Sequence, residues 1–204
     1  MPKQKKSDRR KARQPTNEFE DLAEMRKGLQ ELMYHKSNPD EQFMCYTKIQ
    51  DFWIKHDVGN IQDFQRYERP VFATIKQKYL RVLTIVVFIG WDGLKRFEPV
   101  FVKESLDDDS LFFDEDQLEH MKTGKEEFLQ NQFLFKPETV KEKDDSYVQF
   151  VDAERRLPFD ETDTLVGTGG FGAVTQRTIV SGCLENISTN SKHTGVSQPG
   201  HTPL

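Results

Sequence analysis

Three glycines near residue 170 have the spacing of a loop that binds phosphate groups. Gly167, Gly169 and Gly172 form the pattern G-x-G-x-x-G. Because glycine has no Cβ, such a backbone can approach a nucleotide closely and direct its amide groups at the phosphates. The spacing alone does not identify the nucleotide, since dinucleotide-binding folds use it as well.

The residues around the glycines distinguish between these nucleotide sites. A dinucleotide-binding loop opens a helix, whereas Val174, Thr175, Thr178 and Ile179 favour a strand after this loop. Strand, glycine turn and strand is the arrangement of the protein kinase loop G-x-G-x-x-G-x-V, and Val174 supplies its last position. We therefore expect a hairpin that covers the phosphates of ATP. The alternative is a glycine-rich turn without a ligand.

The candidate ATP site lies in and beside this loop. Backbone amides of the loop would bind the phosphates, and Phe171 at the tip would exclude water. Val166 and Val174 would project onto the adenine. The residues of the site are Val166, Gly167, Thr168, Gly169, Gly170, Phe171, Gly172 and Val174.

Two parts of the sequence resemble fungal protein kinase-like proteins. The segment 156–159 (RLPF) leads into 166–174 (VGTGGFGAV) and looks like the beginning of a protein kinase domain. The segments 79–83 (YLRVL), 88–91 (FIGW) and 110–113 (SLFF) resemble the helical leader of the same proteins. The resemblance implies a serine/threonine-type kinase that transfers phosphate from ATP with the help of Mg²⁺.

Most catalytic residues of a kinase have no counterpart in this sequence. A kinase needs a strand lysine, a helical Glu that holds it, a catalytic Asp in H-R-D and a metal-binding Asp in D-F-G, and the last three are absent. Lys76, in the segment FATIK, precedes the glycine loop and is in the wrong order, and Lys192 follows no apolar strand. We expect an incomplete kinase without catalytic or metal-binding residues, inactive alone, with weak or absent ATP binding.

The elements before the hairpin predict a mainly α leader of three to five helices. The first helix would begin at Asn17, which forms a capping box with Glu20. The second would begin with Asn38 as its cap and Pro39 in its first turn. A non-catalytic helical protein-interaction module, with an incidental glycine turn, is therefore the alternative function.

Two later segments complete the leader. Residues 71–89 fit both helix and strand, and their length and the following Gly90 favour a helix. Within them, the apolar run 82–91 is too short to cross a bilayer and predicts a buried core segment. Residues 118–135 predict a short helix and then an extended piece before Pro137.

Charge and composition predict the remaining organisation. Residues 1–15 carry seven Lys or Arg and one Asp, whereas residues 104–119 carry eight Asp or Glu and no base. Such blocks are typical of solvated tails or loops. The acidic block lacks the glycine and closing Glu of an EF-hand. We expect a disordered basic arm (1–16), a helical leader domain (17–155), the start of a kinase domain (156–179) and a disordered tail (180–204). We interpret the tail as sequence unrelated to a kinase lobe. A change of reading frame or of exon at about residue 180 would produce such a tail.

The cellular setting follows from absences in the sequence. The basic start has no apolar region of a secretory signal, so we expect an intracellular protein, cytoplasmic or nuclear. Cys45 and Cys183 are the only cysteines and do not suggest a disulfide framework. We expect no membrane partner. Because the basic arm has no aromatic residue for base stacking, it predicts either a plain tail or a nuclear-import patch rather than a nucleic-acid site. A protein substrate or partner cannot be named from the sequence.

Overall fold

A computed structural model describes residues 21–35, 37–142, 155–169 and 172–186. The α-helices are α1 (Leu22–Leu32), α2 (Tyr46–Lys55), α3 (Arg69–Lys78), α4 (Leu80–Ile89) and α5 (Lys125–Phe135). Short 3₁₀ helices at Pro39–Glu41, Val58–Asn60, Gln62–Phe64 and Leu94–Arg96 and a π-helical turn at Glu98–Val102 lie between them. The strands are β1 (Val140–Glu142), β2 (Phe159–Gly169), β3 (Gly172–Ile179) and β4 (Leu184–Asn186).

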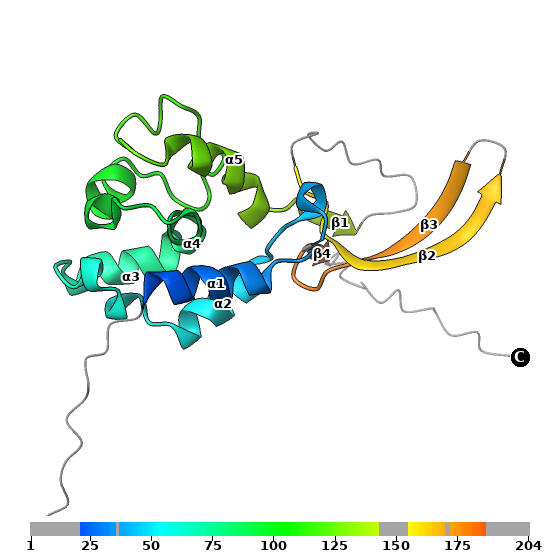
Figure 1. Ribbon diagram of the computed structural model, residues 1–204, viewed down its shortest axis with the longest axis horizontal. Coiled ribbons are helices and arrows are strands. Elements are labelled where there is room, and N and C mark those ends of the chain that lie inside the picture. The colour runs from blue at the N-terminus through cyan, green and yellow to red at the C-terminus, as the bar shows by residue number, and fades with distance from the viewer. Residues whose placement is uncertain (1–20, 36, 143–154, 170–171, 187–204) are drawn as a thin grey trace, which may run out of the picture.

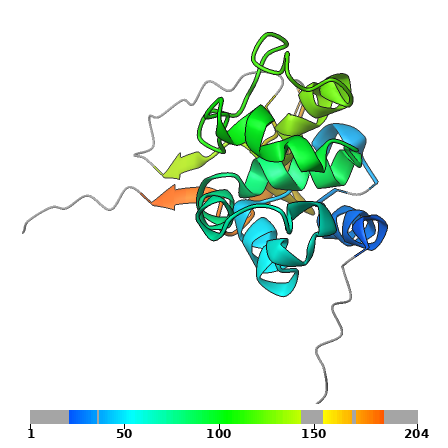
Figure 2. The same cartoon turned by 90° about the vertical axis from the view of Figure 1, so that its left-hand side faces the viewer.

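The helices gather in one body, and the antiparallel hairpin of β2 and β3 extends from it to one side (Figure 1). The short strands β1 and β4 form a parallel pair near the base of the hairpin. Figure 2 views the helical body from the side opposite the hairpin. The predicted order of a mainly helical part followed by a β-hairpin is confirmed.

Helix α4 is the centre of the helical body. It packs against α1, α2, α3 and α5, and seven of its ten residues are buried. A helix that is apolar on every face belongs in an interior, which confirms the prediction of a buried core segment. Gly90 ends the helix with a left-handed φ of 71°, a conformation that glycine adopts without steric cost. No α-helix among the described residues is long and apolar enough to cross a membrane.

Residues 71–89 contain two helices rather than one. The backbone leaves helical geometry at Tyr79, with φ −129° and ψ 20°, between α3 and α4. The first amides of α4 are capped from a distant part of the chain. The carboxylate of Asp108 accepts hydrogen bonds from the backbone N–H groups of Arg81 and Val82, at 2.9 and 3.0 Å. Because this cap lies 26 or more positions away, local periodicity does not reveal the break.

The acidic block is in part folded into the body, which corrects the prediction of a solvated loop. Asp108 is only 6% exposed. Burial raises the pKa of this carboxyl to about 6, although its two amide hydrogen bonds and Arg81 act in the opposite direction. Lys136, after α5, donates hydrogen bonds to three carbonyl oxygens of the block, at 2.8–3.1 Å. The block also contains buried apolar residues, namely Leu106, Leu111, Phe113 and Leu118.

The first two helices begin later than the sequence predicts. Asp21 caps α1 through the amide of Ala23, and the predicted cap at Asn17 lies outside the described residues. The predicted cap at Asn38 is present, since its side chain accepts the amide of Asp40 at 3.2 Å. It opens only a 3₁₀ helix, because the chain then extends to pair Phe43 with Tyr34. Helix α2 begins afterwards, at Tyr46.

The prediction of an extended piece before Pro137 is wrong. Helix α5 begins after Gly124, which has a φ of 71°, and continues to Phe135. Gln132 fixes this helix against the acidic block. Its side chain accepts the amide of Phe113 at 2.8 Å and donates to the carbonyl of the same residue at 3.0 Å. These contacts between segments favour a helix where the local sequence is ambiguous.

Candidate functional site

The glycine-rich segment lies at the turn of an antiparallel hairpin. Strands β2 and β3 pair from Phe159 with Ile179 at the base to Gly169 with Gly172 near the tip. A strand, not a helix, follows the glycines. The predicted strand–turn–strand arrangement is therefore confirmed, and it differs from a dinucleotide-binding loop, which opens a helix. Two predicted site residues at the tip, Gly170 and Phe171, lie outside the described residues.

The glycines of the hairpin leave bare backbone beside the turn. A Cβ on Gly167 would meet no atom within 4 Å, so packing inside the chain does not require glycine at this position. Gly172 has a φ of 144°, which other residues rarely adopt, and a Cβ there would also meet nothing within 4 Å. Both positions are open to an external ligand. This is the property that a phosphate-covering backbone needs.

The predicted adenine contacts lie on the strands next to the turn. The side chains of Val166 and Val174 are each 63% exposed, and that of Leu165 is 60% exposed. The strand register pairs Val174 with Gly167, and a register shift leaves Val166 without an opposite residue. The two valines are thus not cross-strand partners. Thr168 is paired with Ala173 and is exposed as well.

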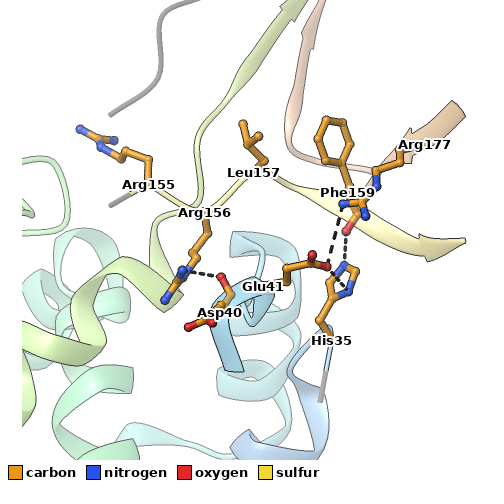
Figure 3. A pocket seen from close by; sticks show the side chains of 8 residues that line it. All are labelled: His35, Asp40, Glu41, Arg155, Arg156, Leu157, Phe159 and Arg177. Carbon is orange, nitrogen blue, oxygen red and sulfur yellow. Dashed lines mark hydrogen bonds and ion pairs between the residues drawn. The ribbon is translucent and has the colours of Figure 1, made fainter. Parts of the chain in front are cut away.

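His35 fastens the base of the hairpin to the helical body (Figure 3). Its ring Nε2 donates a hydrogen bond to the carbonyl oxygen of Phe159 at 2.7 Å, and its backbone N–H donates to the carboxylate of Glu161 at 2.8 Å. The other ring nitrogen, Nδ1, lies 3.3 Å from the carboxylate of Glu41. Both ring nitrogens therefore lie beside oxygen atoms that accept hydrogen bonds.

A second, smaller core lies at the base of the hairpin, and it corrects the prediction of a disordered tail from residue 180. Val180 and Cys183 are 7% and 5% exposed and pack with the fully buried Phe43 and with Cys45. The backbone N–H of Val180 donates to the carbonyl of Pro158 at 2.8 Å. These few apolar residues cannot form a core alone, but they complete one that the helical body supplies. Residues 187–204 lie outside the described part of the chain.

The two cysteines of the small core are free thiols. The Sγ of Cys45 lies 3.0 Å from the hydroxyl of Thr47. Burial raises the pKa of the Cys183 thiol to about 11. A thiol with so high a pKa is a poor nucleophile near neutral pH, because only the thiolate reacts. Both cysteine side chains are buried in the small core.

The lysine-like segment before the glycine loop is helical. Lys76 lies on α3 and forms an ion pair with Asp57 at 2.8 Å, so it is not placed on a strand beside the hairpin. The other lysine considered, Lys192, lies outside the described residues. In the ranges that the structure describes, no group of His, Cys, Asp and Glu could hold a metal ion.

No protein-family model, curated protein or solved structure matches this chain.

Proposed function

We propose that this chain is the front part of a serine/threonine-type protein kinase, in which a helical module carries the glycine-rich loop that covers ATP. One observation supports the proposal most strongly. An antiparallel hairpin extends from the helical body with bare glycine backbone at its turn (Figure 1). Exposed apolar side chains lie beside that turn on both strands. In this proposal, the flat apolar face of an adenine base is the partner of these exposed side chains.

Each part of the hairpin has a role in this proposal. The amides of the loop would donate hydrogen bonds to the phosphate oxygens, and the absence of Cβ atoms at Gly167 and Gly172 would allow a close approach. Val166 and Val174 would contact the adenine, and Phe171 would exclude water from the phosphates. Mg²⁺ would accompany ATP and neutralise part of its charge.

The chain's own contribution is nucleotide covering rather than phosphate transfer. The general base of H-R-D and the metal-binding Asp of D-F-G are absent from the sequence, and both are needed for transfer. In the described part of the chain, β2 and β3 form a two-stranded sheet with no further strand beside them, so the lysine strand, the hinge and the second lobe that form the floor of a kinase nucleotide site do not lie there. Binding of ATP to this chain alone is therefore weak or absent. Because ATP is the substrate, the proposal also places the protein in the cytoplasm or the nucleus.

Sequencing of full-length transcripts separates this proposal from a non-catalytic interaction module. We expect a transcript that joins the codon of Ile179 to a reading frame with a strand lysine, an H-R-D motif and a D-F-G motif. If these motifs occur neither in any transcript nor in the genomic sequence that follows, the kinase proposal fails and the interaction module is favoured.

A further inference from the structure

A cavity of about 230 Å³ lies at the base of the hairpin, at the opposite end from the glycine turn (Figure 3). Its wall combines the helical body, the segment before β2, and both strands. It is lined by His35, Asp40, Glu41, Arg155, Arg156, Leu157, Phe159 and Arg177. Three arginines against two carboxylates give this wall an excess of positive charge.

Most of the charges on the wall are already compensated. Arg155 forms an ion pair with Glu138 at 3.4 Å and lies over the ring of Phe112 at 3.9 Å. Glu41 lies between the ring of His35 at 3.3 Å and the guanidinium of Arg177 at 3.9 Å. The remaining charged groups are the exposed carboxylate of Asp40 and the guanidinium of Arg156.

Arg156 is the cation that this wall leaves uncompensated. Its Nη1 donates to the backbone carbonyl of Asp40, which carries no net charge. Its Nε–H is buried and has no hydrogen-bond partner. Among the described residues, no carboxylate forms an ion pair with Arg156. Because no carboxylate of the described residues neutralises Arg156, the wall keeps an excess of positive charge that favours an anion in the cavity.

We propose that this cavity binds a phosphate group, with Arg156 as the anchoring residue. A guanidinium donates parallel, charge-assisted hydrogen bonds to phosphate oxygens, and in the described part of the chain no carboxylate occupies the guanidinium of Arg156. A tetrahedral dianion also presents oxygens in several directions, toward the separate elements that carry Arg156 and Arg177. A flat carboxylate with one negative charge offers fewer contacts and less charge.

The site is independent of the proposed kinase function, because it lies at the base of the hairpin and uses none of the glycine-loop residues. The position of this site also links two parts of the structure. The wall joins His35 and Glu41 of the helical body to Phe159 and Arg177 of the hairpin. A bound phosphate would therefore strengthen the attachment of the hairpin to the body.

Titration of the isotope-labelled full chain with inorganic phosphate, followed by amide NMR at constant ionic strength, tests the proposal. We expect saturable shifts for the amides of Arg156, Leu157 and Phe159. Arg156→Gln should weaken binding about tenfold, and Arg156→Lys, which keeps the charge but loses the planar guanidinium, should be intermediate. The matched control is Arg66→Gln. Arg66 also donates to a backbone carbonyl, that of Lys95, but lies outside this cavity.

Two further measurements identify the source of the phosphate and distinguish this cavity from the glycine turn. Tighter binding of O-phosphoserine than of inorganic phosphate would support a phosphomonoester ligand, and the reverse would support the free anion. Gly169→Val, at the glycine turn, should leave phosphate binding unchanged even if the kinase proposal fails. Shifts that do not saturate would overturn the site, as would equal affinities of the wild type, Arg156→Gln and Arg156→Lys. Equal losses in Arg156→Gln and Arg66→Gln would also overturn it.

Discussion

The ring of His35 donates a hydrogen bond to the carbonyl oxygen of Phe159 at 2.7 Å, across 124 positions of sequence. His35 follows the end of α1, and Phe159 is the first residue of β2. The backbone at His35 is left-handed, with a φ of 52°, which is uncommon outside glycine. His35 therefore ties the first strand of the hairpin to the end of α1.

Replacement of His35 by Ala should loosen the base of the hairpin. Loss of the ring leaves the Phe159 carbonyl without its donor, at a cost of about 1–2 kcal/mol. Exchange of the Val180 amide, which is bonded to the Pro158 carbonyl at the same base, should become about tenfold faster. Hydrogen exchange measured by mass spectrometry checks this, with His120→Ala as the control, because His120 is exposed and lies just after the acidic block, away from the hairpin. Unchanged exchange at Val180 in His35→Ala would show that another contact holds the hairpin.

Asp108 should make the stability of the helical body depend on pH. Its pKa in the folded state is about 6, above the ordinary value of 3.8, so the folded protein binds the proton more tightly than the unfolded chain. The contribution of the protonated Asp108 carboxyl to the free energy of unfolding is fully present below pH 3.8. It declines as the pH rises toward about 6, and it is absent above that pH. It amounts to about 3 kcal/mol.

Urea unfolding at about pH 4 and about pH 7 measures this effect. Relative to Asp108→Asn, the wild type should gain stability when the pH is lowered. Asp109→Asn, a substitution at the exposed neighbour, is the matched control. If Asp108→Asn and the wild type have the same pH dependence, the carboxyl of Asp108 is not buried as described.

Val180 should contribute to stability although it lies in a polar part of the sequence. It is 7% exposed and belongs to the small core with Phe43, whereas Val174 on the hairpin is 63% exposed. Val180→Ala should lower the unfolding free energy by about 1.5 kcal/mol, and Val174→Ala by less than about 0.5 kcal/mol. If the two substitutions lower the unfolding free energy equally in urea unfolding, residues 180–183 are not packed in the small core, as the prediction of a disordered tail from residue 180 has it.

Local patterns in the sequence predict the elements that neighbouring residues determine. The apolar run of α4 and its end at Gly90 follow from composition and from the conformational freedom of glycine. The strand after the glycine turn follows from β-branched residues such as Val174 and Thr175.

The missed features depend on contacts between distant segments. The break at Tyr79 is stabilised by Asp108, and the sequence presents that residue only as one charge in an acidic block. His35 and Arg156 were not predicted as functional residues, because a lone histidine or arginine carries no spacing signal. The segment RLPF marked Arg156 only as part of a resemblance. Its buried and unpartnered Nε becomes visible only when the hairpin lies against the helical body.

The purified chain should not transfer phosphate. With ATP and Mg²⁺, no protein substrate should be labelled, because the catalytic Asp and the metal-binding Asp of a kinase are both absent from the sequence. Calorimetry should likewise show no saturable ATP binding below the millimolar range. A few exposed hydrogen bonds of about 1 kcal/mol each do not offset the entropy of ordering a glycine-rich loop. Phosphate transfer that a substitution in this chain abolishes would contradict the expectation.

The glycine loop should function when a complete kinase supplies the rest of the nucleotide site. The direct measurement is the KM for ATP of a well-behaved protein kinase whose own glycine loop has been replaced by residues 166–174 of this chain. The KM should stay within about fivefold of that of the parent kinase, and Gly169→Val in the graft should raise it by at least about tenfold, since a side chain there would block the approach to the phosphates. If the graft with its native glycines loses ATP-dependent activity as fully as its Gly169→Val variant does, residues 166–174 are not a kinase glycine loop.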